Sequence, residues 1–170
     1  MSWLKGGFLL VLLLAGGCGY HPMSQPGSLP DGLQTMYIGL FGNRTTEAFL
    51  ENALTEAVVE RFSRQRGLNL VESPARADAL LSGALVGYAL AASAFNRNDQ
   101  ISEYRVSLTM EAELRRRSDG KLLWKGSLER SEEFPGSADK AAQEDNESAA
   151  AQRAIDRLAE ELHYRTLANF

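Results

Sequence analysis

The sequence predicts an α+β domain, a two-layer sandwich in which two amphipathic helices pack on one face of a mixed, largely antiparallel sheet of four or five strands. Apolar and polar residues alternate over residues 104–115, the period of a half-buried strand. Apolar residues recur at helical spacing over residues 46–65 and again over residues 139–167. Because the elements follow one another as strand, helix, strands and helix, a two-layer sandwich is the most economical way to bury one sheet face.

The predicted domain begins with a strand over residues 35–41 and a turn over residues 42–45. Asn43 and Thr45 are the candidates for the N-cap of the helix that follows, because short polar side chains can accept hydrogen bonds from the free N–H groups of a helix start. The helix is expected to end before Gly67, since glycine readily adopts the left-handed conformation that closes many helices.

Further strands are expected over residues 68–72 and 79–92, and a polar turn over residues 96–100. The stretch 79–92 is apolar at both alternating sets of positions, which favours an interior strand with both faces partly covered. Close packing or a bulge explains Gly83 and Gly87 in this strand. A strand without a break has two sets of side chains, Leu80, Val86 and Leu90 on one face and Leu81 and Leu85 on the other.

A hairpin follows, and the two faces of its strands predict its register. A two-residue loop would mix the faces, because it would place Leu114 opposite Lys125. A three-residue loop, Ser118-Asp119-Gly120, keeps the apolar sets together and puts Gly120 at the left-handed position that such loops require. This loop predicts the cross-strand pairs Leu114–Trp124, Met110–Leu128, Glu113–Lys125 and Arg105–Glu133.

The N-terminus has the pattern of an export signal, since Lys5 precedes an apolar run over residues 8–15 and small residues lead to Cys18. The run is too short to span a hydrocarbon core of about 30 Å. Cys18 is the only cysteine, so it cannot form an internal disulfide. Residues 14–18, LAGGC, resemble the lipobox of bacterial lipoproteins, although Ala15 stands where that class usually has Leu. The alternative is an exported protein with a free thiol.

The lipobox resemblance implies cleavage before Cys18, a diacylglycerol thioether on its sulfur and an acylated amine. The predicted organisation is a signal peptide (residues 1–17), a lipidated cysteine with a Pro/Gly tether (18–34) and a single α+β domain (35–170). Gly19 stands where many lipoproteins retained at the inner membrane have Asp. The expected location is therefore the periplasmic side of an outer membrane.

The chain is acidic and shows no motif of known catalytic chemistry. Its net charge of −4 argues against general nucleic-acid binding. His21 and His163 lie at opposite ends of the mature chain, without metal-ligand spacing to a partner. The sequence also lacks a nucleophile elbow, a P-loop and a dinucleotide-binding fingerprint. No enzymatic activity, catalytic residue, metal or cofactor is expected.

Several short motifs are informative through their order along the chain. They are Cys18-Gly19-Tyr20-His21 before the tether, Phe41-x-Asn43-Arg44-Thr45, LxxALTEAVV in the first helix, Ala77-Asp78-Ala79-x-Leu81-x-Gly83, Tyr104-x-Val106 and Gly120-Lys121-Leu122-Leu123-Trp124. Together they resemble the lipopolysaccharide-assembly lipoprotein family LptE, over essentially the whole mature chain. The fold that this resemblance implies, two helices on a four-stranded sheet, agrees with the sandwich predicted from the patterns.

The resemblance also implies a function and two partners. It implies an outer-membrane lipoprotein seated inside the LptD-type β-barrel of the lipopolysaccharide translocon, where it plugs the barrel, helps it assemble and binds lipopolysaccharide. The polar outer faces of the sheet and helices would then contact the polar interior of the barrel. Thr109 and Glu129 are suitable positions to probe the sheet face.

Lipopolysaccharide carries phosphates, which Arg and Lys bind through charge-assisted hydrogen bonds. The densest basic cluster lies around the hairpin turn and is the candidate lipopolysaccharide site: Arg115, Arg116, Arg117, Lys121 and Lys125. Leu122 and Trp124 are near enough in sequence to offer apolar surface to acyl chains, although Trp124 fits the core opposite Leu114. The alternative is a solvated turn whose charges keep the end of the sheet from pairing with another sheet.

Two other classes of protein fit the same predicted topology. Small lipoproteins that activate peptidoglycan synthases, or serve secretion pores, also place an α+β domain on a proline-bearing tether. Their tethers are usually longer than residues 19–32 allow. A periplasmic enzyme is the third alternative, and no motif favours it.

Overall fold

Three long antiparallel strands, β4 (Ala79–Phe95), β5 (Ile101–Arg116) and β6 (Leu122–Pro135), make up most of the sheet. They confirm that the sheet is largely antiparallel. The computed structural model describes residues 32–168, so the expected signal peptide, Cys18 and most of the tether lie outside the described residues.

Three short strands extend the sheet on the β4 side: β1 (Thr35–Ile38), β2 (Gly42–Asn43) and β3 (Asn69–Leu70). The strand order is β3-β1-β4-β5-β6, and β2 pairs with β4 farther along the same side as β1. All pairs that involve the short strands are parallel, so the sheet is mixed, as predicted. It has six strands instead of four or five, partly because the stretch expected as one strand over residues 35–41 is divided into β1 and β2.

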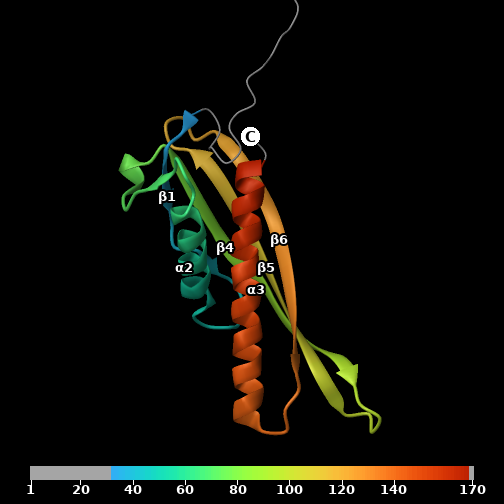
Figure 1. The fold of residues 1–170 in the computed structure, drawn as a ribbon. Helices are drawn as coiled ribbons and strands as arrows, with labels where there is room; N and C mark the ends of the chain where they lie inside the picture. The colour runs from blue at the N-terminus through green and yellow to red at the C-terminus, as the bar shows by residue number, and fades with distance from the viewer. Residues whose placement is uncertain (1–31, 169–170) are drawn as a thin grey trace, which may run out of the picture.

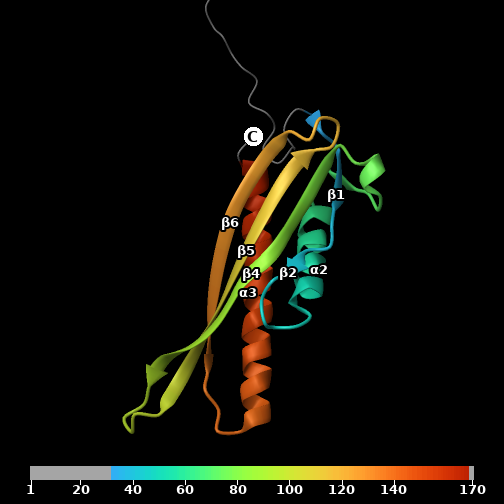
Figure 2. The same ribbon diagram turned by 180° about the vertical axis from the view of Figure 1, so that it is seen from behind.

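Two helices, α2 (Leu50–Ser63) and α3 (Lys140–Ala168), lie on the same face of the sheet (Figures 1 and 2), as predicted. Within residues 32–168, no helix covers the opposite face, which is called the open face below (Figure 2). A short 3₁₀ helix, η2 (Pro74–Arg76), precedes β4. Within residues 32–168, no helix combines the length and the apolar character needed to cross a membrane.

The side of β5 that faces the helices forms the centre of the core. Its alternate residues are buried, as the period-two pattern predicts: Val106, Leu108, Met110, Ala112 and Leu114. Around them pack fully buried apolar side chains from β4 and both helices, including Leu81, Leu85, Leu54, Phe62, Ile155, Leu158 and Leu162. Each such side chain contributes about 1.5–3 kcal/mol on burial, so this layer is the main source of stability.

The hairpin of β5 and β6 has the predicted register. All four expected pairs are present: Leu114–Trp124, Met110–Leu128, Glu113–Lys125 and Arg105–Glu133. The loop is longer than predicted, because Arg115 pairs with Leu122 and leaves Leu123 as an extra residue in β6. Arg116 N–H donates to the Lys121 carbonyl at 2.9 Å and closes a loop over residues 117–120. Gly120 has φ of 70°, as its left-handed position requires.

The predicted division of the β4 side chains between two faces is wrong beyond Leu85. The register with β5 shifts between Leu85 and Gly87, so Val86 is an extra residue in β4. Because one extra residue exchanges the faces of a strand, Leu80 lies opposite Arg115 on the open face, whereas Leu90 lies opposite Val106 on the helix side.

The two glycines of β4 have the roles expected for them. Gly87 lies next to the bulge at Val86. A Cβ atom on Gly83 would lie 2.5 Å from the Glu111 carbonyl oxygen and 2.6 Å from the Phe41 ring. Close packing therefore requires glycine at this position.

The start of α2 also differs from the prediction. The helix begins at Leu50 instead of Thr46, and Phe49 occupies its N-cap position with φ of 68° and no side-chain hydrogen bond. Neither Asn43 nor Thr45 caps the helix. The Asn43 side chain instead accepts from the Thr45 N–H at 3.0 Å and donates to the Glu47 carbonyl at 2.6 Å, which organises the loop before the helix.

Candidate functional site

The five basic residues predicted to bind lipopolysaccharide lie at and near the turn from β5 to β6. Arg115 donates to both carboxylate oxygens of Glu113, at 2.7 and 3.0 Å. This contact lowers the pKa of Glu113 and raises the pKa of Arg115. Arg116 donates to Asp119 within the turn at 3.0 Å. The Lys121 N–H, and then Arg116, lower the pKa of Asp119.

Arg117 links the turn to the segment just before β4. Its N–H donates to the Asp78 carbonyl at 2.8 Å, and its guanidinium donates to the Ala77 carbonyl. The Asp78 carboxylate in turn accepts from the N–H groups of Gln34 and Thr35 at 3.1 and 3.0 Å. Hydrogen bonds from the Thr35 side chain and from these two N–H groups lower the pKa of Asp78. Arg117 therefore has a structural role.

Lys121 and Lys125 are the two exposed lysines of the predicted site. Lys125 lies on the open face and lines a shallow groove of about 320 Å³ together with Arg44, Glu111 and Glu113. The structure thus brings the five residues to one end of the sheet. It does not make them one free cationic patch, since Arg115, Arg116 and Arg117 each have partners in the protein.

The open face of the hairpin is polar along its length. Its cross-strand pairs are Arg105–Glu133, Ser107–Ser131, Thr109–Glu129, Glu111–Ser127 and Glu113–Lys125. Arg105 and Glu133 form an ion pair at 2.6 Å, and the Ser107 and Ser131 hydroxyls lie 2.8 Å apart. Thr109 and Glu129 stand directly opposite each other in the middle of this face, so both are suitable probe positions.

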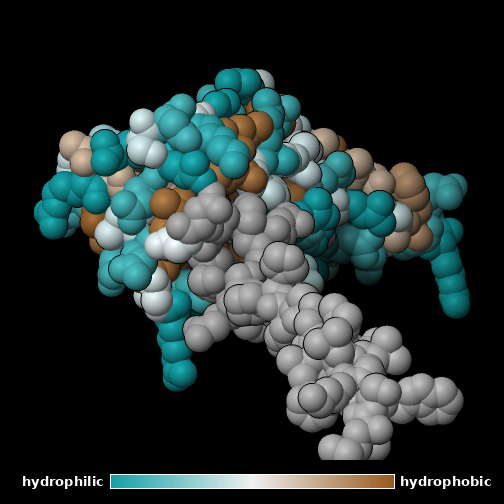
Figure 3. Space-filling view, turned by 90° about the horizontal axis from the view of Figure 1, so that it is seen from above, coloured by the Kyte–Doolittle hydropathy of each residue, from teal (hydrophilic) through white to brown (hydrophobic). Residues whose placement is uncertain are grey.

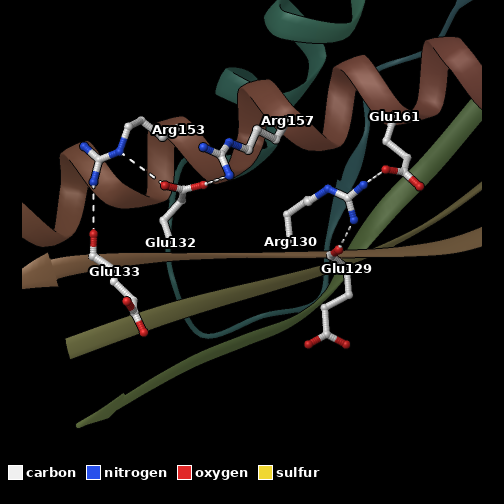
Figure 4. A network of polar contacts seen from close by, with 7 residues as sticks. All are labelled: Glu129, Arg130, Glu132, Glu133, Arg153, Arg157 and Glu161. Atoms are coloured by element: carbon white, nitrogen blue, oxygen red, sulfur yellow. Dashed lines mark hydrogen bonds and ion pairs between the residues drawn. The ribbon is translucent and has the colours of Figure 1, made fainter. Parts of the chain in front are cut away.

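A polar network between α3 and β6 was not predicted from the sequence (Figure 4). The Glu132 carboxylate is 10% exposed and pairs with Arg157 at 2.8 Å and with Arg153 at 3.5 Å. Glu161 pairs with Arg130, and also with Arg165 at 2.7 Å. The pairs of Glu132 with Arg153 and Arg157, and of Arg130 with Glu161, fasten the edge strand β6 to the long helix beside the apolar core.

The sequence did contain a signal for this network. Arg130 and Glu132 fall on the alternate positions of β6 that elsewhere hold Trp124 and Leu128, so two charges interrupt an apolar face. In the last helix, Arg153, Arg157, Glu161 and Arg165 recur every four residues, which places them on one side of the helix. Two charged rows on elements expected to pack together indicate ion pairs between them.

A groove of about 830 Å³ lies near the C-terminal ends of α2 and α3, where Arg61, Arg64 and Arg165 are among the lining residues. Its arginines are paired with carboxylates, as in Arg61–Glu160, Arg64–Glu60 and Arg165–Glu161. The groove is therefore not a free anion site.

His163, in the same groove, is half-buried. Its ring packs edge-on against Phe62 at 5.0 Å, and its Nε2 lies 3.2 Å from the Gln65 Oε1. Burial lowers the pKa of His163. Within residues 32–168, no group of three or more potential metal ligands is close enough to hold a metal ion.

The Glu132→Gln variant tests the network. Loss of the carboxylate leaves two arginines without their partner, so the free energy of unfolding should fall by about 1–3 kcal/mol. The expected loss is smaller than for a fully buried pair because both arginines reach water. Glu129→Gln is the matched control on the open face and should change stability by about 0.5 kcal/mol or less. Urea unfolding measures both, and equal effects would contradict a special role for Glu132.

The chain is similar to a known protein family and to several solved structures. The family model described as lipopolysaccharide-assembly, LptE, matches residues 33–166. A search of curated proteins finds no match. A solved structure of lipoprotein B from Nitrosomonas europaea has a TM-score of 0.56 at 14% identity, covering 88% of this chain and 91% of that chain. The rare lipoprotein B from Shewanella oneidensis has a TM-score of 0.53 at 12% identity, covering 80% and 95%.

At these identities the likeness to solved structures shows a shared fold. Membership rests instead on the family model, whose match includes both helices almost entirely and every strand of the sheet. The chain belongs to the lipopolysaccharide-assembly family LptE.

Proposed function

We propose that this chain is an outer-membrane lipoprotein that partners the β-barrel of the lipopolysaccharide translocon. It supports assembly of the barrel and binds lipopolysaccharide on its way to the cell surface, without catalysis. The observation that carries the proposal is the family match over residues 33–166. Acyl chains on Cys18 anchor the protein on the periplasmic side of the membrane.

The polar open face supports a contact with the inside of a barrel. The interior of a large outer-membrane barrel is polar and water-filled. A face with serine, threonine and charges of both signs can replace its hydrogen bonds to water with hydrogen bonds to polar groups of the barrel wall. The apolar core lies on the other side of the sheet, so contact through the open face leaves the core intact.

A photo-crosslinking residue at Thr109 or at Glu129 should give an adduct with the barrel protein in cells. Both positions are central on the open face and opposite each other, so they report on one surface. The same residue at Glu56, exposed on α2, shows whether the helix side also meets the barrel. If the domain is folded and neither sheet position gives a barrel adduct, the open face is not the contact.

Intact mass spectrometry tests the anchor. The mature protein should begin at Cys18, with its amine blocked and the mass of its acyl groups added. Cys18→Ser should abolish the added mass, and the variant should leave the membrane fraction because the acyl chains supply the membrane affinity. A free amine at any other residue of the mature parent would contradict the anchor.

Lipopolysaccharide binding at the hairpin turn is best tested through the two exposed lysines. The double variant Lys121→Gln and Lys125→Gln should weaken binding at low salt by about threefold to tenfold, because each exposed charge contributes at most about 1 kcal/mol. It spares the arginines, which have structural partners. Arg97→Gln with Lys140→Gln removes the same charge from distant exposed positions and is the matched control.

Titration with lipopolysaccharide measures binding by both double variants. If the lysine variant binds lipopolysaccharide as the parent does, the basic cluster is not the binding site and its residues belong to a solvated turn. An equal loss in the control variant would mean that net charge alone is responsible.

A further inference from the structure

In the described part of the chain, the second half of β4 has a neighbouring strand on only one side. β1 and β2 pair with β4 between Ala79 and Leu85, and the Arg44 N–H donates to the Leu85 carbonyl at 2.9 Å. Among the described residues, no strand other than β5 pairs with residues 86–95. This free side of β4 over residues 86–95 is called the open edge. In Figures 1 and 2 the ends of β4 and β5 project together beyond α2.

The backbone of the open edge directs hydrogen-bonding groups outward. In an antiparallel ladder, alternate residues turn their N–H and C=O groups toward one neighbour and then toward the other. Leu81 and Leu85 turn their carbonyls away from β5, toward Gly39 and Arg44. The extra residue Val86 moves this alternation by one position. The outward residues beyond the bulge are therefore Tyr88, Leu90 and Ala92, and the register shifts again after Ala92.

The two edges of the long sheet differ in charge. β6, at the opposite edge, carries five charged residues: Lys125, Glu129, Arg130, Glu132 and Glu133. It also ends at a proline. Charges and proline are two of the features with which proteins protect an edge from pairing with another strand. β4 contains no charged residue along its entire 17 residues, so its open edge lacks this protection.

Three large side chains of the projecting end are apolar although they are exposed, next to the polar turn over residues 96–100. Leu90 is 42% exposed, Phe95 is 63% exposed and Ile101, across the turn, is 40% exposed. Figure 3 shows apolar surface along the part of the molecule that projects to the right. The buried hydroxyl of Ser93 has no hydrogen-bond partner among the described residues. An interior strand needs no charges, but this half of β4 is not interior.

We propose that the open edge binds an extended, uncharged segment of a partner protein, which adds a strand to the sheet next to β4. A row of free N–H and C=O groups matches the backbone of another strand. Acyl chains could cover the apolar side chains but would leave those backbone groups without hydrogen bonds. The partner strand lies where β2 would lie if it continued past Asn43.

This inference rests on the proposed function in one respect, because that function identifies the barrel protein as the source of the segment. The wall of a closed barrel has no free edge, so the segment comes from a loop or a terminal region of that protein.

Ala92→Pro removes one outward N–H and leaves the ladder to β5 intact, since proline is tolerated where the N–H faces away from the sheet. Ser127→Pro makes the matched change at the β6 edge. In β6, as in β4, alternate residues turn their N–H and C=O groups away from β5, and Ser127 is one of them. Ala92→Lys keeps the N–H and adds the kind of charge that protects β6. Circular dichroism confirms folding of each variant.

A photo-crosslinking residue at Ala91, an exposed neighbour of the outward residues, reports occupancy in cells. The adduct should map by mass spectrometry to one short segment of one protein. Ala92→Pro should reduce its yield by about tenfold, the effect of losing roughly one hydrogen bond. Ala92→Lys should reduce it by a similar factor, because an added charge opposes pairing of a further strand. Ser127→Pro should leave the yield within about twofold.

The inference is overturned if Ala91 gives no adduct, or if its adducts are scattered over many proteins or join a second copy of this chain. It is also overturned if Ala92→Pro and Ser127→Pro lose the adduct equally. Copurification of the barrel with the parent protein tests the proposed function separately. If the barrel copurifies and Ala91 gives no adduct, only the edge inference fails. If the adduct maps to one segment of a different protein and Ala92→Pro removes it, the edge inference holds and the proposed partner is wrong.

Discussion

Burial of one face of β5 is the constraint on which the rest of the structure depends. β5 is the strand between the other two long strands, and its alternate residues from Val106 to Leu114 lie under the helices. Those positions fix which way β4 and β6 must face, because cross-strand neighbours share a face. The ion pairs of Glu132 with Arg157 and of Arg130 with Glu161 then hold α3 at the margin of that apolar layer.

Features that depend on residues near in sequence could be predicted, and features that depend on distant contacts could not. The hairpin register followed from matching two faces of adjacent strands, and all four pairs were right. A bulge near Gly87 was one of the expectations, but its effect on the faces of β4 was not foreseen, and neither was the extra residue Leu123, since alternation alone does not show where a strand carries an unpaired residue. The cap of α2 was wrong because Asn43 was already engaged by β2 and its own loop.

The candidate lipopolysaccharide site illustrates the same limit. The sequence located a dense basic cluster, and the structure places all five residues at one end of the sheet. Sequence spacing could not reveal that Arg117 binds carbonyl groups next to η2, or that Arg115 binds Glu113 on its own strand. Such partners come from the fold, and they separate cations that build the turn from the exposed Lys121 and Lys125.

The length of β4 determines how far apart two ends of the molecule are. Met36, in the first strand of the described chain, pairs with Ala79 at the beginning of β4, while Phe95 lies at its other end. A strand of 17 residues spans roughly 55 Å at about 3.3 Å per residue. The sheet is thus a rigid spacer. Whatever the N-terminal segment is attached to, the projecting end is held several nanometres away from the point where that segment joins the domain.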